Sequence, residues 1–437
     1  MPERDPVQRA SDFDEVNLGF TARLAVEEAE RCLRCPRAKC IEGCPVGVRI
    51  DEFIVLVAEG RFEEAARVIE ADNALPAVCG RVCPQEAQCE GACVLIRKGR
   101  PIAIGHLERF VADFQRDFGL LGETPPPPPS GHRVAVVGSG PAGLACASDL
   151  ARAGHAVTLF EALHEPGGVL VYGIPEYRLP RQVVRAEIER LGRLGIELAT
   201  NIPVGLALTI DDLLGEYDAV FLGVGAGLPR FLGIPGENLV GAYSANEFLT
   251  RVNLMKAHLP GAETPVQDLR GRRVAVFGAG NTAMDAVRTG LRLGAAEATV
   301  FYRRTRDEMP ARAEEIRHAE EEGVRFSYLT APLELRGDAN GRLQSVTLQE
   351  MRLGEPGEDG RRRPEPIPGA RHEEPADVAI VAIGNAPNPM IARTDTSIRH
   401  TSRGTIDADP ATGRTSRVGV FAGGDIVTGG AIIGAFR

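Results

Sequence analysis

The chain has 437 residues, of which 43% are hydrophobic and 25% charged, and its formal net charge is −10. This length predicts roughly two to three domains, and the composition is typical of folded globular proteins rather than disordered ones. The sequence contains no run of about 18 apolar residues that could cross a membrane, and no export signal is visible at the start. The acidic balance argues against nucleic acid or an anionic membrane as the main partner.

Eight of the nine cysteines lie between Cys32 and Cys93, and only Cys146 stands apart. A disulfide scaffold is normally short and exported, so this crowding indicates metal or cluster ligation in a reducing cytoplasm. Cys146 follows a glycine-rich loop among small apolar residues, and we expect it to be a core residue rather than a ligand.

Residues 1–124 are predicted to be helical, because apolar residues recur at helical spacing in 22–32 and 63–71. The Pro-rich stretch 125–131 is then predicted to be a stiff linker between domains.

The cysteine spacing within this first domain resembles a two-cluster ferredoxin-like arrangement, with one Cys-Pro pair in each half. In such runs the fourth cysteine serves the other cluster. The spacing therefore assigns one 4Fe-4S cluster to Cys32, Cys35, Cys40 and Cys93. It assigns the second to Cys44, Cys83 and Cys89, with Cys79 as the fourth ligand that spacing alone selects. Two structural zinc sites, each held by four cysteines, are the alternative.

After the linker, short β-branched runs alternate with glycine-rich turns and helices, which predicts parallel sheets with crossover helices. This strand–glycine–helix unit begins once at Arg133 and again at Arg273, so we expect two dinucleotide-binding domains. The expected fold class is α/β, with an N-terminal helical iron–sulfur domain followed by two Rossmann-like domains. The polar stretch 354–372 is predicted to be an exposed hairpin or loop.

The first glycine-rich turn has the form G-x-G-x-x-G between a strand and a helix, which places a pyrophosphate at the helix N-terminus. Its residues are Gly138, Ser139, Gly140, Pro141, Ala142 and Gly143. Glu161 ends the next predicted strand, where an acidic residue accepts hydrogen bonds from a ribose.

The second turn contains Gly278 and Gly280, and its following strand ends in Arg303 and Arg304 instead of an acidic residue. Guanidinium groups bind a 2′-phosphate that a carboxylate would repel, so this pair favours NADPH over NADH. The alternative is that both arginines are merely solvated.

Several long motifs resemble the glutamate synthase small subunit family over nearly the whole chain. They are Arg31-CLRC, CIEGCPVGV, Asn73-ALPAVCGRVCPQEAQCEGAC, IGHLERF, Gly167-GVLVYGIPEYRLP, Gly278-AGNTAMD, Tyr302-RRTRDEMPAR and Phe421-AGGDIVTG. The same module resembles the large subunit of NADH-dependent reduced ferredoxin:NADP oxidoreductase. Dihydropyrimidine dehydrogenase is a more distant relative.

This resemblance implies FAD in the first nucleotide site, NADPH in the second and two 4Fe-4S clusters. It divides the chain after the linker into FAD-binding residues 132–228, NADPH-binding residues 229–374 and a second FAD-binding part, 375–437. It also points to Glu108, instead of Cys79, as the fourth ligand of the cluster nearer the flavin.

The resemblance further implies particular cofactor contacts. Those to the flavin are Gly167, Gly168, Arg178, Gly225, Gly384, Gly424 and Asp425. Those accompanying the arginines at NADPH are Asn281, Thr282 and Arg312. For Arg178 the alternative is a surface salt bridge.

The implied function is an NADPH-oxidising FAD/iron–sulfur electron-transfer subunit, and no residue is nominated as a catalytic acid, base or nucleophile. Its partner would be the glutamate synthase large subunit, which carries the glutamine chemistry, in a cytoplasmic hetero-oligomer. The alternatives are the NADPH-binding subunit of an electron-bifurcating transhydrogenase, or an iron–sulfur module without flavin turnover. The family continues beyond Gly430 into a helix that covers the flavin, whereas this sequence ends at Arg437, so weaker FAD binding is expected.

Overall fold

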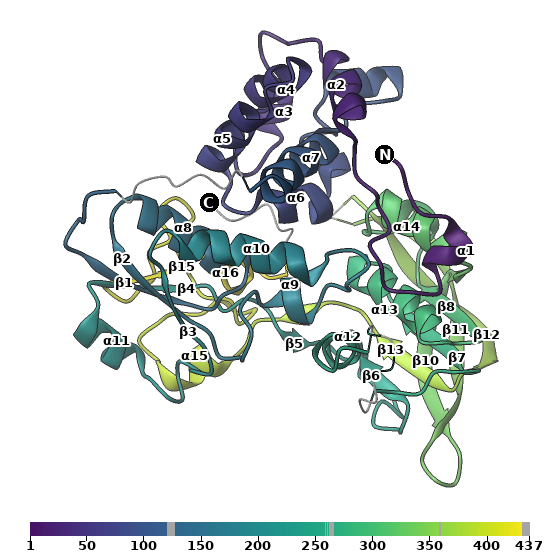
Figure 1. The fold of residues 1–437 in the computed structure, drawn as a ribbon. Coiled ribbons are helices and arrows are strands. Elements are labelled where there is room, and N and C mark those ends of the chain that lie inside the picture. The colour runs from purple at the N-terminus through teal and green to yellow at the C-terminus, as the bar shows by residue number, and fades with distance from the viewer. Residues whose placement is uncertain (120–126, 258, 260, 262–265, 358–359, 431–437) are drawn as a thin grey trace.

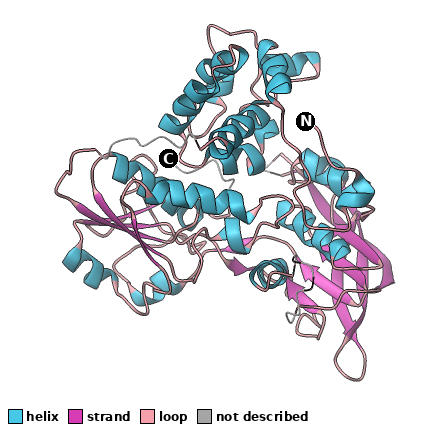
Figure 2. Cartoon of the chain, viewed as in Figure 1, coloured by secondary structure: helices cyan, strands magenta, loops and turns pink. Residues whose placement is uncertain are grey.

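The computed structural model describes residues 1–119, 127–257, 259, 261, 266–357 and 360–430. It contains a helical N-terminal domain and two parallel sheets with helices on their faces (Figures 1 and 2), so the expected fold class is confirmed. The residues around the expected start of the linker, 120–126, and the final residues 431–437 lie outside the described part. Within the described part, no helix combines the length and apolar character that a membrane span requires.

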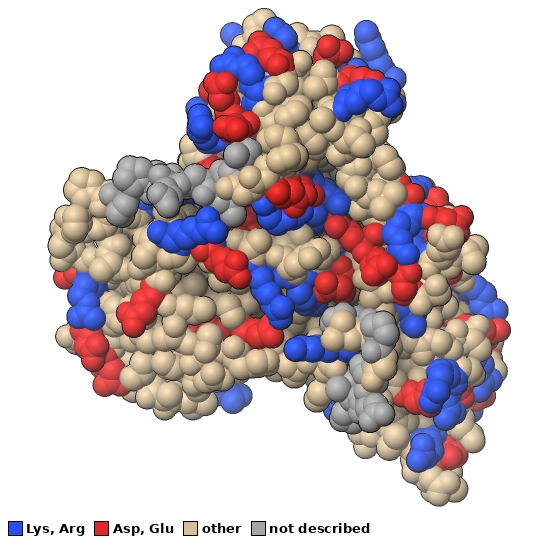
Figure 3. All heavy atoms as spheres, viewed as in Figure 1, with Lys and Arg blue, Asp and Glu red and all other residues tan. Residues whose placement is uncertain are grey.

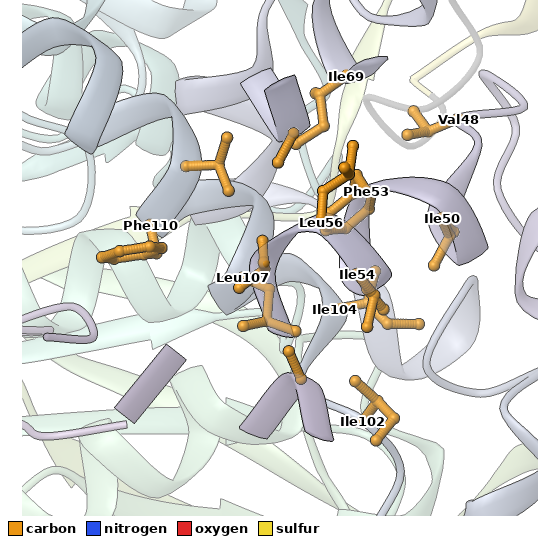
Figure 4. Close-up of a cluster of buried hydrophobic side chains, with 14 of the residues drawn as sticks. Val48, Ile50, Phe53, Ile54, Leu56, Ile69, Ile102, Ile104, Leu107 and Phe110 are labelled. Carbon is orange, nitrogen blue, oxygen red and sulfur yellow. The ribbon is translucent and has the colours of Figure 1, made fainter. Parts of the chain in front are cut away.

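The N-terminal domain packs its helices around one apolar core (Figure 4). Its elements are α1 (Pro6–Arg9), α2 (Ala22–Glu30), α3 (Lys39–Glu42), α4 (Ile50–Ala58), α5 (Phe62–Asp72), α6 (Pro76–Val82), the 3-10 helices η1 (Gln85–Ala87) and η2 (Val94–Lys98), and α7 (Ile104–Asp117). Helix α7 carries Ile104, Leu107 and Val111 at helical spacing, and these bury in one core with Phe53 and Ile54 of α4. Five cysteines lie in or against this core: Cys32, Cys40, Cys44, Cys89 and Cys93. Core packing therefore fixes where the thiols stand.

The first parallel sheet has the strand order β15-β4-β1-β2-β3. Its strands are β1 (Arg133–Val137), β2 (Ala156–Phe160), β3 (Glu197–Ala199), β4 (Ala219–Leu222) and β15 (Val420–Ala422). The helices that accompany it are α8 (Pro141–Arg152), α9 (Val169–Tyr172), α10 (Arg181–Gly192), α11 (Ile210–Glu216), α15 (Met390–Thr394) and α16 (Asp425–Thr428). Because β15 comes from the end of the chain, a second domain is inserted within this one.

The inserted domain contains the second parallel sheet, of order β6-β13-β7-β8-β9. Its strands are β6 (Ala242–Ser244), β7 (Arg273–Phe277), β8 (Glu297–Tyr302), β9 (Arg325–Tyr328) and β13 (Val378–Val381), and its helices are α12 (Ala245–Leu254), α13 (Asn281–Arg292), η3 (Arg306–Glu308) and α14 (Ala313–Glu321). The expected boundary at residue 375 is wrong by this pairing, because β13 joins β7 and β6 of the second sheet. A buried apolar strand does not reveal from sequence which sheet it enters.

Two further strand systems complete the inserted domain. β10 (Thr330–Gly337), β11 (Leu343–Pro356) and β12 (Arg362–Pro375) form an antiparallel sheet, so the expected hairpin in 354–372 is confirmed in its described residues. The short strands β5 (Leu228–Pro229) and β14 (Asn385–Ala386) pair antiparallel. They are the two points at which the chain crosses between the FAD-type and the inserted sheet, so both crossings lie side by side.

A buried ion-pair network ties the N-terminal segment to the inserted domain. Glu322, directly after α14, accepts hydrogen bonds from Arg288 Nη2 at 2.8 Å, Arg292 Nη1 at 2.7 Å and Arg9 Nε at 3.1 Å. The guanidinium groups of Arg288 and Arg292 also lie over the ring of Tyr177, which precedes α10. Residues from α1, the FAD-type domain and the inserted domain therefore meet at one buried carboxylate.

Candidate redox-cofactor sites

The eight clustered cysteines separate into two sets in space. The outer set comprises Cys32, Cys35, Cys40 and Cys93. Burial, with the Cys93 and Cys32 thiols nearby, raises the pKa of the Cys40 thiol to about 11. Burial also raises the pKa of the Cys32 thiol, which faces Cys35 and Cys93. The structure thus brings Cys93 to the first three cysteines, although 53 residues separate it in sequence from the nearest of them.

The inner set brings Cys44 of the first motif to Cys83 and Cys89 of the second. Burial and the neighbouring groups Glu90, Glu108 and Cys44 raise the pKa of the Cys89 thiol. Burial raises the pKa of the Glu108 carboxyl itself to about 7, although a hydrogen bond from Asn73 opposes the shift. The carboxylate of α7 therefore stands among the inner thiols, where the family resemblance placed it.

Cys79 and Glu108 both lie beside the inner set, and Asn73 connects them. Its Nδ2 donates to Glu108 Oε1 at 2.7 Å, and its Oδ1 lies 3.7 Å from the Cys79 sulfur. Cys79 is buried, and a hydrogen bond between the Cys79 and Cys83 side chains raises the pKa of Cys83. Which of the two completes the inner set stays a prediction. Sequence reasoning missed Asn73 as a site residue, although it begins the quoted motif that holds the inner cysteines.

The residues present fit iron–sulfur ligation. None of the cysteines in the described chain forms a disulfide. The Cys44 sulfur accepts hydrogen bonds from the backbone N–H groups of Val46, Gly47 and Val48. Backbone N–H groups directed at sulfur stabilise the charge of a cluster thiolate and tune its potential. In the outer set, the backbone N–H of Arg34 is directed at the Cys32 sulfur, and Arg34 has a left-handed φ of 48°.

The first glycine loop forms a close turn between β1 and α8. A Cβ at Gly143 would lie 1.8 Å from the backbone oxygen of Gly138, so only glycine allows this helix–strand approach. At Gly140, by contrast, no described protein atom lies within 4 Å of an added Cβ. Pro141 and Ala142 open α8, whose N-terminus faces this space. The loop therefore leaves room at the position where a pyrophosphate approaches the backbone.

Glu161 is buried at the end of β2 and is held by the loop itself. Its Oε2 accepts hydrogen bonds from the backbone N and the hydroxyl of Ser139, and its Oε1 accepts one from Leu163 N at 2.9 Å. The hydroxyl of Ser139 in turn accepts a hydrogen bond from Gly167 N at 2.9 Å. Glu161 thus organises the loop in this structure, and its contact with a ribose stays a prediction.

The other glycines assigned to the flavin lie around the same loop. A Cβ at Gly168 would lie 2.9 Å from the Cα of Gly140, so the two glycine-rich segments pack directly together. Gly225 and Gly384 have positive φ values of 68° and 97°, with no described atom within 4 Å of an added Cβ. Two further residues, Gly424 and Asp425, form the start of α16.

Arg178 is buried, with 7% of its side chain exposed, so the alternative of a surface salt bridge is wrong. Its side chain reaches across to the inserted domain, and its contact with the flavin stays a prediction. Its Nη1 donates to Asp285 Oδ2 at 2.5 Å, and its Nε lies 3.4 Å from Glu315 Oε1. Arg178 in this structure joins the two nucleotide-binding domains.

The second glycine loop repeats the first between β7 and α13. Gly278 has a φ of 125°, and a Cβ there would lie 2.3 Å from the Ala382 oxygen, whereas Gly280 again faces open space. Asn281 begins α13, and its Oδ1 accepts a hydrogen bond from Arg312 N at 2.9 Å. The neighbouring Thr282 is exposed.

The three arginines assigned to NADPH are placed differently. Arg303 is exposed at the end of β8, whereas Arg304 is buried and its Nε donates to the Arg362 oxygen at 2.7 Å. The side chain of Arg312 donates to the Arg81 oxygen at 2.8 Å and to Gln85 Oε1 at 2.9 Å, in the loop that carries the inner cysteines. Arg303 is therefore the exposed member of the expected pair, and Arg312 docks the inserted domain on the helical domain. The contact of these arginines with NADPH stays a prediction.

Cys146 lies on α8 against the core of the first parallel sheet. Burial raises the pKa of its thiol to about 12. Its placement agrees with a core residue, since it stands apart from both thiol sets.

Comparison with known proteins identifies the modules. Residues 9–120 match the family model described as dihydropyrimidine dehydrogenase domain II, 4Fe-4S cluster, which favours iron–sulfur over zinc, and residues 132–434 match pyridine nucleotide-disulphide oxidoreductase. The glutamate synthase [NADPH] small chain of Escherichia coli is 38% identical over 437 residues, covering 99% of this chain and 93% of that protein. The NADP(+)-dependent formate dehydrogenase subunit beta of Moorella thermoacetica is 40% identical, covering 90% of this chain and 57% of that protein.

Among solved structures, FprA of Mycobacterium tuberculosis in complex with NADPH matches with a TM-score of 0.58 and 23% identity. The match covers 69% of this chain and 81% of the FprA chain, and it supports the fold of the two nucleotide-binding domains. The chain therefore belongs to the glutamate synthase small chain family of NAD(P)-dependent FAD oxidoreductases with an N-terminal 4Fe-4S domain.

Proposed function

We propose that this chain is the NADPH-oxidising electron-transfer subunit of a glutamate synthase, with FAD at the first glycine loop, NADPH at the second and two 4Fe-4S clusters in the helical domain. The observation that carries the proposal is the sorting of the cysteines into two separate sets in a chain that also has two dinucleotide-type glycine loops. When bound, these cofactors supply hydride transfer from NADPH to the flavin and single-electron transfer through the clusters. The protein's side chains hold, orient and tune them.

The position of the inner set supports an order along the relay. Glu187 of α10, in the FAD-type domain, lies near Glu108 and accepts a hydrogen bond from Ala77 N of α6 at 2.9 Å. The inner thiols therefore stand next to the flavin-binding domain. The outer thiols are carried by segments whose residues are largely exposed. This arrangement supports entry of electrons at the inner set and exit at the outer set.

The choice of nucleotide and partner rests on two further observations. Arg303 is an exposed cation at the end of β8, where a 2′-phosphate would be recognised. A glutamate synthase small chain is matched over 93% of its length, whereas the formate dehydrogenase subunit is matched over 57% of its length. A separate large chain would then receive the electrons in a hetero-oligomer.

An anaerobic reconstitution tests the proposal. The chain is titrated with NADPH or NADH while flavin absorbance is followed, and is then mixed with the glutamate synthase large chain, glutamine and 2-oxoglutarate. The proposal predicts flavin bleaching by NADPH, much less by NADH, and glutamate formation that requires both chains. Bleaching by NADPH without glutamate formation would rule out the glutamate synthase partnership while leaving the oxidoreductase intact.

A further inference from the structure

Asn73 joins the two candidates for the fourth ligand of the inner set through one buried amide. The residue is 5% exposed, and its side chain contacts both α6, which carries Cys79, and α7, which carries Glu108. Its Oδ1 accepts the backbone N–H of Leu75 at 3.0 Å and the Cys79 S–H at 3.7 Å. Its Nδ2 donates to Glu108 Oε1 at 2.7 Å. One side chain thus treats the carboxylate and the thiol in opposite ways.

The backbone fixes the orientation of the Asn73 amide. The N–H of Leu75 can only donate, so it selects the oxygen end of the amide and turns the NH2 end toward Glu108. The backbone of Asn73 is held as well, because its N–H donates to the Ile69 oxygen at 2.8 Å at the end of α5. The amide therefore offers its donor to Glu108 and its acceptor to Cys79, and the two ends cannot be exchanged.

Helices α6 and α7 hold the two candidate ligands close together. A Cβ at Gly80, next to Cys79, would lie 2.6 Å from the backbone N of Arg109, next to Glu108, so the two helix backbones touch at this point. Helix α7 is packed into the core of the helical domain (Figure 4), which fixes the backbone of Glu108. The hydrogen bond from Asn73 then sets where the carboxylate points.

The electrostatic surroundings of Glu108 make Asn73 its stabilising partner. Acidic side chains on the visible face of the molecule lie among Lys and Arg side chains (Figure 3). Glu108 instead stands near a second carboxylate, Glu187, and near the three inner thiols. Among the described residues, the hydrogen bond that favours its charged form comes from Asn73. With Oε1 engaged by this bond, Oε2 is the oxygen left for a metal ion.

Cys79 is engaged by the same amide in the opposite sense. Its S–H donates to Asn73 Oδ1, and the thiol also forms a hydrogen bond with Cys83. The thiolate is the form of cysteine that binds a metal. A Cys79 thiolate would have no proton to share with the amide oxygen, and the two electron-rich atoms would repel each other. The amide therefore disfavours Cys79 as a ligand while it favours Glu108.

We propose that Asn73 is a positioning residue that selects Glu108 instead of Cys79 as the fourth ligand of the inner 4Fe-4S cluster. The inference rests on the proposed function, because it requires a cluster at the inner thiols. Asn73 acts through Glu108 and does not bind iron itself. Since the ligands of a cluster and the hydrogen bonds around it set its potential, Asn73 also sets how readily the inner cluster takes up an electron.

The test uses the full chain loaded with its cofactors under anaerobic conditions. Asn73→Asp keeps an oxygen for Leu75 N and removes the donor to Glu108 with almost no change of shape. Adding Glu108→Gln restores a hydrogen bond of reversed direction, because the glutamine NH2 can donate while its oxygen faces the metal. Asn253→Asp is the matched control, since Asn253 is 7% exposed in α12 of the inserted domain and donates to the Tyr172 oxygen at 2.9 Å.

Iron content distinguishes the variants. Cys79→Ser should keep about eight iron per chain, as in the original chain, and Asn253→Asp/Cys79→Ser should do the same. Asn73→Asp/Cys79→Ser should hold about four, because the carboxylate is no longer directed at the cluster and the thiol that could replace it is gone. The triple variant Asn73→Asp/Glu108→Gln/Cys79→Ser should regain about eight, which a merely structural role of Asn73 would not explain.

Electron paramagnetic resonance of the dithionite-reduced protein gives a second readout. Asn73→Asp alone should shift the g values of one of the two cluster signals or remove that signal, and Asn253→Asp should leave both unchanged. About eight iron in Asn73→Asp/Cys79→Ser, about four in Cys79→Ser alone, or about four in the triple variant would overturn the proposal.

Bleaching of the flavin by NADPH is read separately in the original chain. If bleaching fails while the iron contents follow the stated pattern, the proposed function fails and the role of Asn73 stands. If the flavin bleaches and the iron pattern is absent, only the role of Asn73 fails. An original chain without iron would overturn both.

Discussion

Replacing Glu322 with alanine removes the carboxylate on which three buried guanidinium groups converge. The side chains of Arg288, Arg292 and Glu322 are at most 1% exposed, and Arg9 is 1% exposed. Water therefore cannot take the place of the lost carboxylate. Arg288 keeps Glu315, and Arg9 keeps Glu3 and Glu321, whereas Arg292 loses its carboxylate partner Glu322. A buried charge that loses its ion-pair partner costs about 3–5 kcal/mol.

Such a loss has a clear thermal signature. For a domain of roughly 150–250 residues, each kcal/mol shifts Tm by about 2–4 °C, so Glu322→Ala should lower the Tm of this part of the protein by roughly 6–20 °C. Urea denaturation followed by far-UV circular dichroism gives the free energy of unfolding directly. The matched control is Glu320→Ala at the end of α14, two residues before Glu322, because Glu320 and its partner Arg306 are 36% and 50% exposed. This surface pair should contribute about 0–1 kcal/mol. A loss below about 1 kcal/mol for Glu322→Ala would refute the reasoning.

The same carboxylate makes stability depend on pH. Burial alone raises the pKa of Glu322, but Arg288 and Arg292 outweigh burial and hold it at about 2, below the ordinary value of 4.5. Because the pKa is depressed in the folded state, the stabilisation is complete above about pH 4.5 and is lost as the pH falls toward 2. Glu322→Gln should therefore flatten the decline of stability in this window. An unchanged slope would contradict the assignment.

Three further predictions concern the cofactor sites. Gly140→Ala should fold normally yet retain little FAD, because its Cβ enters space free of protein atoms, whereas Gly143→Ala should impair folding through its 1.8 Å contact. Circular dichroism and FAD content distinguish the two variants, and equal behaviour of both would contradict the assignment of the space at Gly140 to the pyrophosphate. Cys93→Ser should remove about half of the bound iron, while Cys79→Ser should retain nearly all, as measured by iron analysis. If Cys79→Ser lost half of the iron and Cys93→Ser retained it, Cys79 would be the cluster ligand and Cys93 would not. Arg303→Glu should lower the kcat/KM preference for NADPH over NADH about 10–150-fold, the value of one charge-assisted hydrogen bond of about 1.5–3 kcal/mol. An unchanged preference would remove Arg303 from the nucleotide site.

The sequence was sufficient to predict those features of the fold and the site that follow from a motif or a spacing rule. The strand–glycine–helix units at Gly138 and Gly278 were predictable because their turns require positive φ or a close backbone approach. The crossing of Cys44 and Cys93 between the thiol sets followed from the spacing rule for paired clusters. Each of the two turns depends on a short stretch of chain, whereas the cysteine crossing joins distant segments and was predictable only because the spacing rule already relates them.

The features that could not be predicted depend on contacts between distant segments. Arg178 meets a carboxylate 107 residues away, and Arg312 meets the loop of the inner cysteines at a separation of 231 residues. An arginine in a family motif looks the same in sequence whether it binds a cofactor or a neighbouring domain. The sheet to which β13 belongs is likewise set by its neighbours β6 and β7, because an apolar run of four residues fits either core.

The central claim is that one chain holds two iron–sulfur clusters and one flavin that NADPH reduces. The most direct measurement is the content of iron, acid-labile sulfide and FAD per chain after anaerobic purification, followed by addition of NADPH. The account predicts about eight iron and eight sulfide with one FAD, and bleaching of the flavin by NADPH, since each 4Fe-4S cluster holds four of each. Zinc in place of iron, or iron without FAD, would contradict it.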